Sequence, residues 1–385
     1  MISSFSRAVP VLFGPGASMR TGLEVKQAGV QKVLCVYDQG IKSAGIADGV
    51  INNLKEAGLR VVVFEEVQAD PSDTLINEAA QMATAEKVDG IVGVGGGSSM
   101  DMAKAINVLL TNPPPINLYY VATGNEHKPG KFMVLIPTTA GTGSEATPIS
   151  VVSDIPTQSK KGVIGPATVA TLAIVDPELL LGLPSQITAS TGMDAFSHAV
   201  EALTSKGMNP MSDLLAEKAV SLIVENLGKT VKDGSNMAAR TNMSFASLIA
   251  GMAFSDALVH WGHAIAHTIG AHHHVPHGIA CAVTLPAVVE YVADAVPDKV
   301  QRVAQAMGLT IQGGLPPEEL GIKVADAIRD LNREVGIPSL KSFKIEKGSL
   351  EQLISGVLTD DCAMFGPKQA SADQVLAMMK KAYEY

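Results

Sequence analysis

The stretch GIVGVGGGSSMDMAKA, residues Gly90–Ala105, decides the fold class of this 385-residue chain. Its first part is a β-branched run that predicts a strand, and its last part predicts a helix. Adjacent glycines between them let the backbone approach an anion, and the start of a helix presents free N–H groups. The pattern favours a diphosphate-binding turn, although it is not G-x-G-x-x-G. The alternative is a tight turn that needs glycine for its geometry alone.

Three more strand signals flank this stretch, at Lys32–Asp38, Arg60–Val67 and Phe132–Thr139. Segments with helical spacing of apolar residues lie between them, at Ser43–Gly58 and Asp73–Lys87. Strands that alternate with helices are typical of a parallel, doubly wound sheet. We therefore predict an α/β domain of the Rossmann-like type over residues 1–183.

Strand signals largely vanish after Pro184, and stretches rich in Ala, Leu and Met follow. Their spacing predicts an all-α second domain over residues 184–385. The predicted helices are Thr188–Leu203, Pro210–Leu227, Met237–Phe254, Trp261–Gly270, Pro297–Met307 and Glu318–Val335.

Composition excludes several classes of function. The formal net charge is −9 and no basic stripe is present, which argues against nucleic-acid binding. The three cysteines are few and far apart, so a disulfide framework is not expected and a reducing compartment is favoured. The N-terminal segment lacks a long apolar core, and no apolar run approaches the ~20 residues that span a bilayer. We expect a cytoplasmic protein without a membrane partner.

A second polar turn follows the strand signal at Phe132. It reads IPTTAGTGSEAT, residues Ile136–Thr147, and its hydroxyl groups would suit a ribose, a diphosphate or an amide. The alternative is a hydroxyl-capped loop before a helix. Open α/β sheets bind ligands at the carboxyl ends of their strands. Two such turns after two strands therefore strengthen the ligand-binding interpretation of each. Asp38 ends another strand signal, where an acid would bind an adenosine ribose and favour NAD over NADP. It would otherwise be a helix cap or a solvated acid.

The predicted helical domain contains possible metal ligands. Asp194 and His198 lie four residues apart, so they share one face of a helix. An exposed ion pair is the alternative, but the small and apolar neighbours indicate burial, and a buried acid needs a partner. Six of the nine histidines fall between His263 and His277. A surface run of histidines would chelate metal without function, yet the surrounding residues are apolar. Three imidazoles and one carboxylate would suit a divalent transition metal such as iron or zinc.

Four motifs together resemble those of the iron-containing, or group III, alcohol dehydrogenase family. They are GGGSSMDMAKA, PTTAGTGSEAT, GMDAFSHAVEA and HAIAHTIGAHHHVPHG, and the resemblance extends to LTDDCAMFGP near the C-terminus. It covers nearly the whole chain. It implies an N-terminal Rossmann-like domain and an α-helical C-terminal domain, as in dehydroquinate synthase-like proteins, with the active site between them.

The resemblance also implies roles for individual residues. The implied metal ligands are Asp194, His198, His263 and His277. The implied cofactor site comprises Asp38, Gly95, Gly96, Gly97, Ser98, Asp101, Thr138, Thr139, Thr142 and Lys160. His267 matches a histidine beside the metal that would pass a proton to solvent.

The function implied is that of a metal-dependent, NAD(H)-linked alcohol dehydrogenase that acts as an aldehyde reductase in cells. The metal would be Fe(II), with Zn(II) or another divalent ion as the alternative. It would polarise the substrate oxygen while hydride moves to or from the nicotinamide. A homodimer or a larger homo-oligomer is implied. Two alternatives stay open: a zinc-dependent, glycerol-type polyol dehydrogenase and a metal-binding structural protein.

Several residues depart from the family's usual pattern. His260 and Trp261 replace small or aliphatic residues, and they would line the substrate pocket or pack the domain. The triplet His272–His274 would contact substrate or compete for metal. Pro148 and Ile149 follow the second turn where more polar residues are usual. The added polarity leads to the hypothesis of a short polar or anionic aldehyde substrate.

Overall fold

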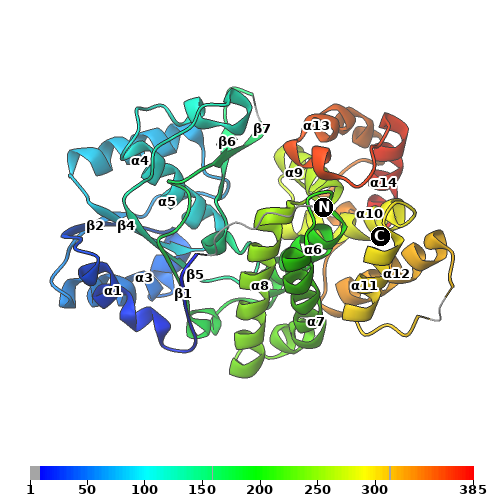
Figure 1. The fold of residues 1–385 in the computed structure, drawn as a ribbon, viewed down its shortest axis with the longest axis horizontal. Coiled ribbons are helices and arrows are strands. Elements are labelled where there is room, and N and C mark those ends of the chain that lie inside the picture. Colours follow the sequence, from blue (N-terminus) through cyan, green and yellow to red (C-terminus); the bar gives the residue numbers. More distant parts are fainter. Residues whose placement is uncertain (1–8, 158, 312–313) are drawn as a thin grey trace. The chain divides into compact units, whose positions relative to one another are not determined.

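The computed structural model describes residues 9–157, 159–311 and 314–385, so the start of the chain, where we expected no leader, lies outside the described residues. Two compact units are present. The sheet unit comprises residues 9–139 and 143–182, and the helical unit comprises residues 140–142 and 183–385. Figure 1 draws the sheet unit in blue to teal and the helical unit in green to red.

The sheet unit is built on six parallel strands in the order β1-β8-β5-β4-β2-β3. Their bounds are β1 Val11–Phe13, β2 Lys32–Val36, β3 Arg60–Phe64, β4 Gly90–Gly95, β5 Phe132–Pro137 and β8 Leu172–Val175. The connecting helices are α1 Thr21–Gln27, α2 Gln39–Ser43, α3 Ile46–Glu56, α4 Asp73–Ala85 and α5 Gly97–Leu109. The predicted parallel, doubly wound sheet is confirmed.

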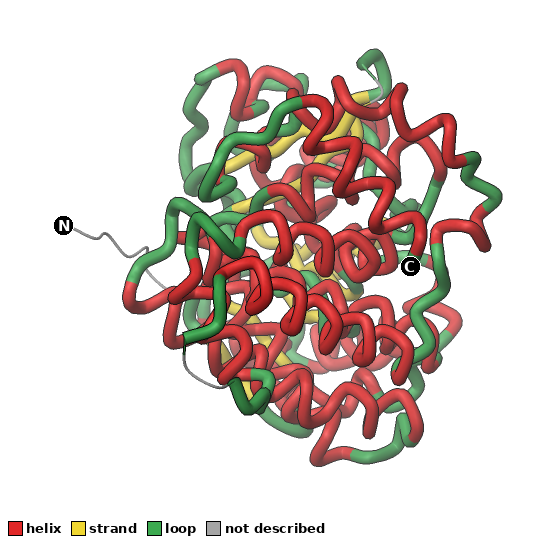
Figure 2. The backbone as a smooth tube through the Cα atoms, turned by 90° about the vertical axis from the view of Figure 1, so that its right-hand side faces the viewer, coloured by secondary structure: helices red, strands yellow, loops and turns green. Residues whose placement is uncertain are grey.

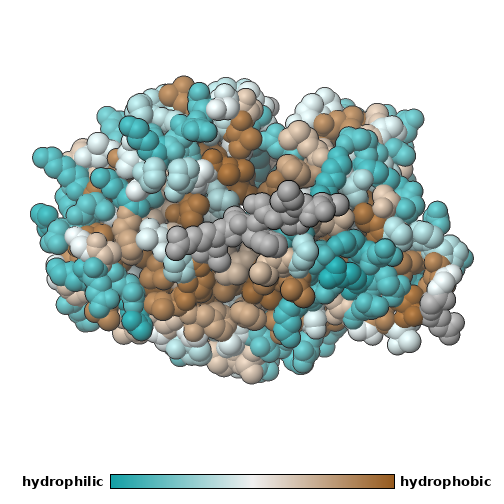
Figure 3. All heavy atoms as spheres, viewed as in Figure 1, coloured by the Kyte–Doolittle hydropathy of each residue, from teal (hydrophilic) through white to brown (hydrophobic). Residues whose placement is uncertain are grey.

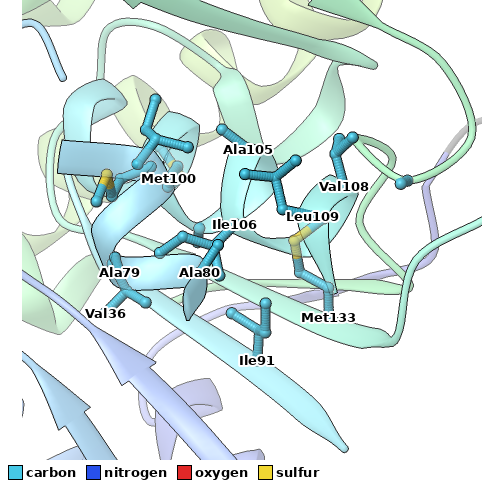
Figure 4. Close-up of a cluster of buried hydrophobic side chains, with 14 of the residues drawn as sticks. Val36, Ala79, Ala80, Ile91, Met100, Ala105, Ile106, Val108, Leu109 and Met133 are labelled. Carbon is cyan, nitrogen blue, oxygen red and sulfur yellow. The ribbon is translucent and has the colours of Figure 1, made fainter. Parts of the chain in front are cut away.

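Both faces of the inner strands are buried, and successive strand residues point to opposite faces. In β2, Val33 and Cys35 join the core beneath α1 and α3. Leu34 and Val36 join the core beneath α4 and α5, which Figure 4 shows around Ile106. Burial on both faces explains why these strands read as continuous apolar runs.

Three parts of the sheet unit were not predicted. The edge strand β1 and the inner strand β8 have three and four residues, too few for a periodic signal. The turn Ile136–Thr147 contains a short 3-10 turn, Ser144–Ala146, and in the described residues no helix directly follows it, as the alternative interpretation would require. An antiparallel hairpin follows, formed by β6 Ile149–Asp154 and β7 Ser159–Ile164.

The helical unit has no strand among its described residues, which confirms the predicted all-α character (Figure 2, helices in red). Its helices are α6 Ser185–Thr204, α7 Pro210–Lys232, α8 Met237–Ala257, α9 Trp261–His273, α10 His277–Val292, α11 Pro297–Ala306, α12 Pro317–Glu334, α13 Ile354–Thr359 and α14 Ala372–Glu384. Helix α10 escaped prediction because it is apolar almost all round and contains Pro286, so its apolar residues show no periodicity.

No single described helix is long and apolar enough to span a membrane. Helices α8 and α9 together have the length and hydropathy of a span, but a bend of 105° separates them. Both helices are largely buried in the helical unit. Hydrophilic residues are spread over the visible faces of both units (Figure 3).

Candidate functional site

Three helices of the helical unit bring the four predicted metal ligands together. Asp194 and His198 lie one turn apart on α6, His263 lies in the first turn of α9, and His277 begins α10. Asp194 Oδ1 is 3.4 Å from His277 Nε2 and 4.0 Å from His263 Nε2. His198 Nδ1 is 4.0 Å from Asp194 Oδ2. The carboxylate is therefore the common neighbour of all three imidazoles.

The ring nitrogens provide a test of whether a cation fits here. Nδ1 of His198 and Nε2 of His263 are buried and have no hydrogen-bond partner among the described residues. Leaving such atoms unsatisfied is costly, and a divalent cation would satisfy both. Burial, followed by the neighbouring His263, holds the pKa of His198 well below its usual value, so its ring is neutral and able to ligate. The donor set fits iron or zinc.

Further contacts hold the rings in place. The His198 ring stacks between Phe254 and His263, with centroid distances of 4.3 and 4.6 Å. The Cys281 thiol, one turn after His277 on α10, lies 3.5 Å from His277 Nε2. Cys281 groups with Asp194, His263 and His277 as a possible ligand set, and the sequence patterns had not indicated it.

Glu201 is the main residue of this region that the sequence did not single out. It is fully buried on α6, and its carboxylate accepts a hydrogen bond from His263 Nδ1 and others from the backbone at the start of α9. Burial acts to raise the pKa of Glu201, but the imidazoles of His260 and His263 and these hydrogen bonds lower it to about 2. Burial likewise opposes protonation of His263, yet Glu201 raises the pKa of that ring. Its position seven residues after Asp194, on the same helical face, was an available signal.

His267 has a carboxylate partner of its own. Its Nδ1 lies 3.0 Å from Asp360 Oδ2, and its ring stacks on His277 with centroids 5.4 Å apart. Burial opposes ionisation of Asp360, but His267 lowers the pKa of this carboxyl. Burial and the adjacent Asp360 raise the pKa of the Cys362 thiol well above its usual value. The motif LTDDCAMFGP contains Asp360, but its sequence alone indicates no role for this residue.

The residues that depart from the family pattern at α9 differ in burial. His260 and Trp261 are buried, with Thr204 Oγ1 2.8 Å from His260 Nε2 and the indole N–H donating to the Lys368 carbonyl. These contacts favour the packing interpretation for both. His272–His274 form the last turn of α9 and its left-handed cap. The hypothesis of a short polar or anionic aldehyde substrate stays a prediction.

The glycine turn of the sheet unit has the geometry that an anion site needs. Gly95 has φ +148°, and a side chain there would collide with Ser99. Gly96 precedes α5, which begins at Gly97, so the first N–H groups of the helix are exposed at the carboxyl end of β4. Thr138 donates its N–H to the Gly95 carbonyl, and Thr139 lies against Gly96. Six of the ten predicted cofactor residues, Gly95, Gly96, Gly97, Ser98, Thr138 and Thr139, therefore gather at one edge of the sheet.

The other predicted cofactor residues have various surroundings. Lys160 pairs with Asp70 at 2.7 Å, and the Asp70 N–H donates to Ser98 Oγ, which links Lys160 to the turn. Asp38 caps α2 by accepting from Ile41 N, as in the capping alternative. The Asp101 carboxylate accepts hydrogen bonds from Ser144 Oγ and from the Val151 backbone N–H. Thr142 belongs to the short segment 140–142 that groups with the helical unit.

Lys104 was not anticipated, although it lies one turn after Asp101 on α5. Its buried ammonium donates to Ser144 O and Oγ, to Thr147 Oγ1 and to the Ile149 carbonyl. Burial lowers the pKa of Lys104 to about 8 and raises the pKa of the neighbouring Glu145 to about 7. This lysine ties the hydroxyl-rich turn to α5.

A parallel sheet with a glycine turn before a helix and a separate His3Asp cluster are the features that the sequence predicted for a metal-dependent dehydrogenase. Residues 9–177 match the family described as iron-containing alcohol dehydrogenase, and residues 188–383 match its C-terminal domain. An NAD-dependent methanol dehydrogenase of Bacillus methanolicus is 36% identical over 372 residues, which is 96% of this chain and 97% of that protein. A 1,3-propanediol dehydrogenase of Citrobacter freundii is 37% identical over 377 residues, 96% of each chain.

Solved structures agree with the sequence comparisons. The crystal structure of a 1,3-propanediol oxidoreductase superposes with a TM-score of 0.93 at 36% identity, covering 98% of this chain and 100% of that one. The chain belongs to the iron-containing alcohol dehydrogenase family. The predicted fold and enzyme class are confirmed: it is a metal-dependent alcohol dehydrogenase with iron and NAD as cofactors.

Proposed function

We propose that this enzyme interconverts a short primary alcohol and its aldehyde, with the metal held by Asp194, His198, His263 and His277. The observation that carries the assignment is the convergence of three imidazoles on the Asp194 carboxylate, with two buried ring nitrogens lacking other partners. When bound, a divalent metal polarises the substrate oxygen, and NAD takes or returns the hydride.

The chain's own residues supply positioning and proton transfer. We assign the first turn of α5, with Gly95, Gly96 and Gly97, to the cofactor diphosphate, since its N–H groups are exposed at the edge of the sheet. Ser98, Thr138, Thr139 and Lys160 surround this turn in the same unit. Asp38, Asp101 and Thr142 stay predictions as cofactor contacts.

His267 is proposed as the proton-relay residue. It is partly exposed, so it has access to solvent, and its ring stacks on the candidate ligand His277. Asp360 accepts from its Nδ1, which leaves Nε2 to exchange a proton. Asp360 therefore orients the ring.

The substrate class is proposed from chemistry shared by the relatives. Two of them are named for methanol and 1,3-propanediol, both short primary alcohols. We further propose a cytoplasmic location, supported by three cysteines that form no disulfide among the described residues. A homodimer or larger homo-oligomer is proposed from the family resemblance alone, and light scattering at assay concentration tests it.

The test is NADH oxidation with a panel of aldehydes, using the enzyme purified without oxygen and reconstituted with Fe(II). We expect turnover to be highest with aldehydes of about one to four carbons. Activity that rises steadily with alkyl chain length would contradict the substrate class, and no turnover with any restored metal would contradict the enzyme assignment. As a control for the ligands, His263→Ala is expected to lose metal and activity while staying folded, and retained metal in that variant would contradict the ligand set.

A further inference from the structure

The carboxylate of Glu201 lies at the junction of two helices in the helical unit. Glu201 belongs to α6, seven residues after Asp194, and it is 0% exposed. Helix α9 begins directly beside it and has no capping side chain of its own at its N-cap, His260. Glu201 therefore faces the exposed N–H groups and the positive end of the dipole of α9.

The two oxygens of this carboxylate have different donors. Oε1 accepts from the backbone N–H groups of Gly262, at 2.7 Å, and of His260, at 3.2 Å. Oε2 accepts from the backbone N–H of His263, at 3.2 Å, and from its ring Nδ1. Three of the four donors belong to the backbone and cannot change. Only the ring nitrogen has a choice between donating and accepting.

This arrangement determines the tautomer of His263. An ionised carboxylate can only accept, so Nδ1 must carry the proton. Nε2 then has its lone pair available, and it is the atom that lies 4.0 Å from Asp194 Oδ1. A histidine that donates its second ring N–H to a carboxylate is held in one orientation and becomes a more basic metal ligand.

We propose that Glu201 is a positioning residue of the metal centre: it caps α9 and fixes His263 with Nε2 unprotonated toward Asp194. The inference rests on the proposed ligand set. It adds a residue that touches neither metal nor substrate and that controls how tightly the metal is held. His260 Nδ1 also lies 3.2 Å from Glu201 Oε1, so the carboxylate is enclosed by the start of α9.

Glu201→Gln separates this role from simple capping. Glutamine keeps the size of the side chain but has one acceptor oxygen and one N–H2 group. The amide oxygen is expected beside Gly262 and His260, because that side has two backbone N–H donors and the other side has only the N–H of His263. The N–H2 group is then left beside His263, where it forces Nδ1 to accept and moves the proton to Nε2. The ring would then present a proton, and not a lone pair, toward Asp194.

The experiment titrates metal-free, full-length wild type and Glu201→Gln with Zn(II) against a competing chelator. We expect the variant to bind Zn(II) ~10- to 100-fold more weakly, the usual cost of removing such an outer partner. A nitrogen-detected NMR spectrum of the histidine rings in the metal-free proteins gives a second readout. The proton of His263 is expected on Nδ1 in the wild type and on Nε2 in the variant.

Asp213→Asn is the matched control, because Asp213 is another buried carboxylate of the helical unit. It pairs with Lys299 and Arg302 away from the histidines. This control is expected to lose stability without a change in Zn(II) affinity or in the His263 tautomer. An equal loss of affinity in both variants would overturn the proposal, because the effect would then be general destabilisation.

Wild-type Zn(II) affinity in Glu201→Gln, or a proton on Nε2 of His263 in the wild type, would also overturn it. Failure of the proposed function is distinguishable from either outcome. If the proposed ligand set is wrong, the wild type and His263→Ala would bind Zn(II) with the same affinity. The tautomer measurement on metal-free protein tests Glu201 even then.

Discussion

His267 and the candidate ligand His263 each have a carboxylate beside Nδ1, Asp360 for the first and Glu201 for the second. The two rings differ in burial: His267 is partly exposed, whereas Nε2 of His263 is buried and has no hydrogen-bond partner among the described residues. An imidazole held by one carboxylate and partly exposed suits proton exchange. Buried nitrogens that face a shared carboxylate suit a cation. Neighbouring histidines in one stretch of sequence therefore have different chemistry.

At this scale we predict that His267→Gln lowers kcat by roughly 10²- to 10⁴-fold, the range for loss of a general acid or base. Metal content should stay at the wild-type level, because His267 is not among the residues grouped around Asp194. Rate profiles against pH and metal analysis of the purified variant check both parts. A variant that lost its metal would place His267 among the ligands instead.

Among the secondary-structure elements, helix α5 has two structural roles. Its first turn forms the proposed anion site, and one turn further in, Lys104 anchors the segment Ser144–Ile149 through four hydrogen bonds. A buried ammonium costs free energy unless its hydrogen bonds are satisfied, and here the acceptors are fixed oxygens. Helix α5 thus holds the hydroxyl-rich turn in place through Lys104, and its own first turn presents the N–H groups of the proposed anion site.

We predict that Lys104→Met lowers the free energy of unfolding by about 3 kcal/mol, since buried acceptors lose their donor. The variant should also bind NADH more weakly, because the turn after β5 is no longer anchored. Denaturant unfolding and fluorescence titration with NADH measure the two effects. As a control, Lys42→Met removes an exposed lysine paired with Glu65 and should cost at most about 1 kcal/mol. Equal losses in the two variants would contradict the anchoring role.

The whole molecule divides its chemistry between two compact units. All four proposed metal ligands lie in the helical unit, and the glycine turn lies in the sheet unit. A ligand that binds only the native state stabilises it by about 2.7 kcal/mol at 100 times its dissociation constant. Each cofactor is therefore expected to stabilise the unit that holds its contacts.

This expectation can be measured by amide hydrogen exchange. Zn(II) added to the metal-free enzyme should slow exchange mainly in α6, α9 and α10, whereas NAD should slow it around Gly95–Ser98. His263→Ala should lose the protection by Zn(II) and keep the protection by NAD. Protection by Zn(II) centred on α5 would show that the metal site has been placed in the wrong unit.

Local sequence determined much of this protein. Alternating strand and helix signals predicted the parallel sheet, because every inner strand is buried on both faces and is therefore apolar. Glycines before a helix indicated the anion turn, since Gly95 has a backbone conformation that other residues avoid. The i, i+4 spacing of Asp194 and His198 indicated a shared helical face. The choice of His263 and His277 within a run of histidines came from the family resemblance.

Only the tertiary structure decided what each polar side chain contacts. The short strands β1 and β8 form by pairing with distant partners, and the uniformly apolar α10 has no periodic signal. The roles of Glu201 and Lys104 depend on donors and acceptors that lie about forty to sixty residues away along the chain. Their positions on helix faces were readable in advance, but their partners were not. Spacing within one helix is set by its own geometry, whereas hydrogen bonds between elements depend on how the whole chain packs.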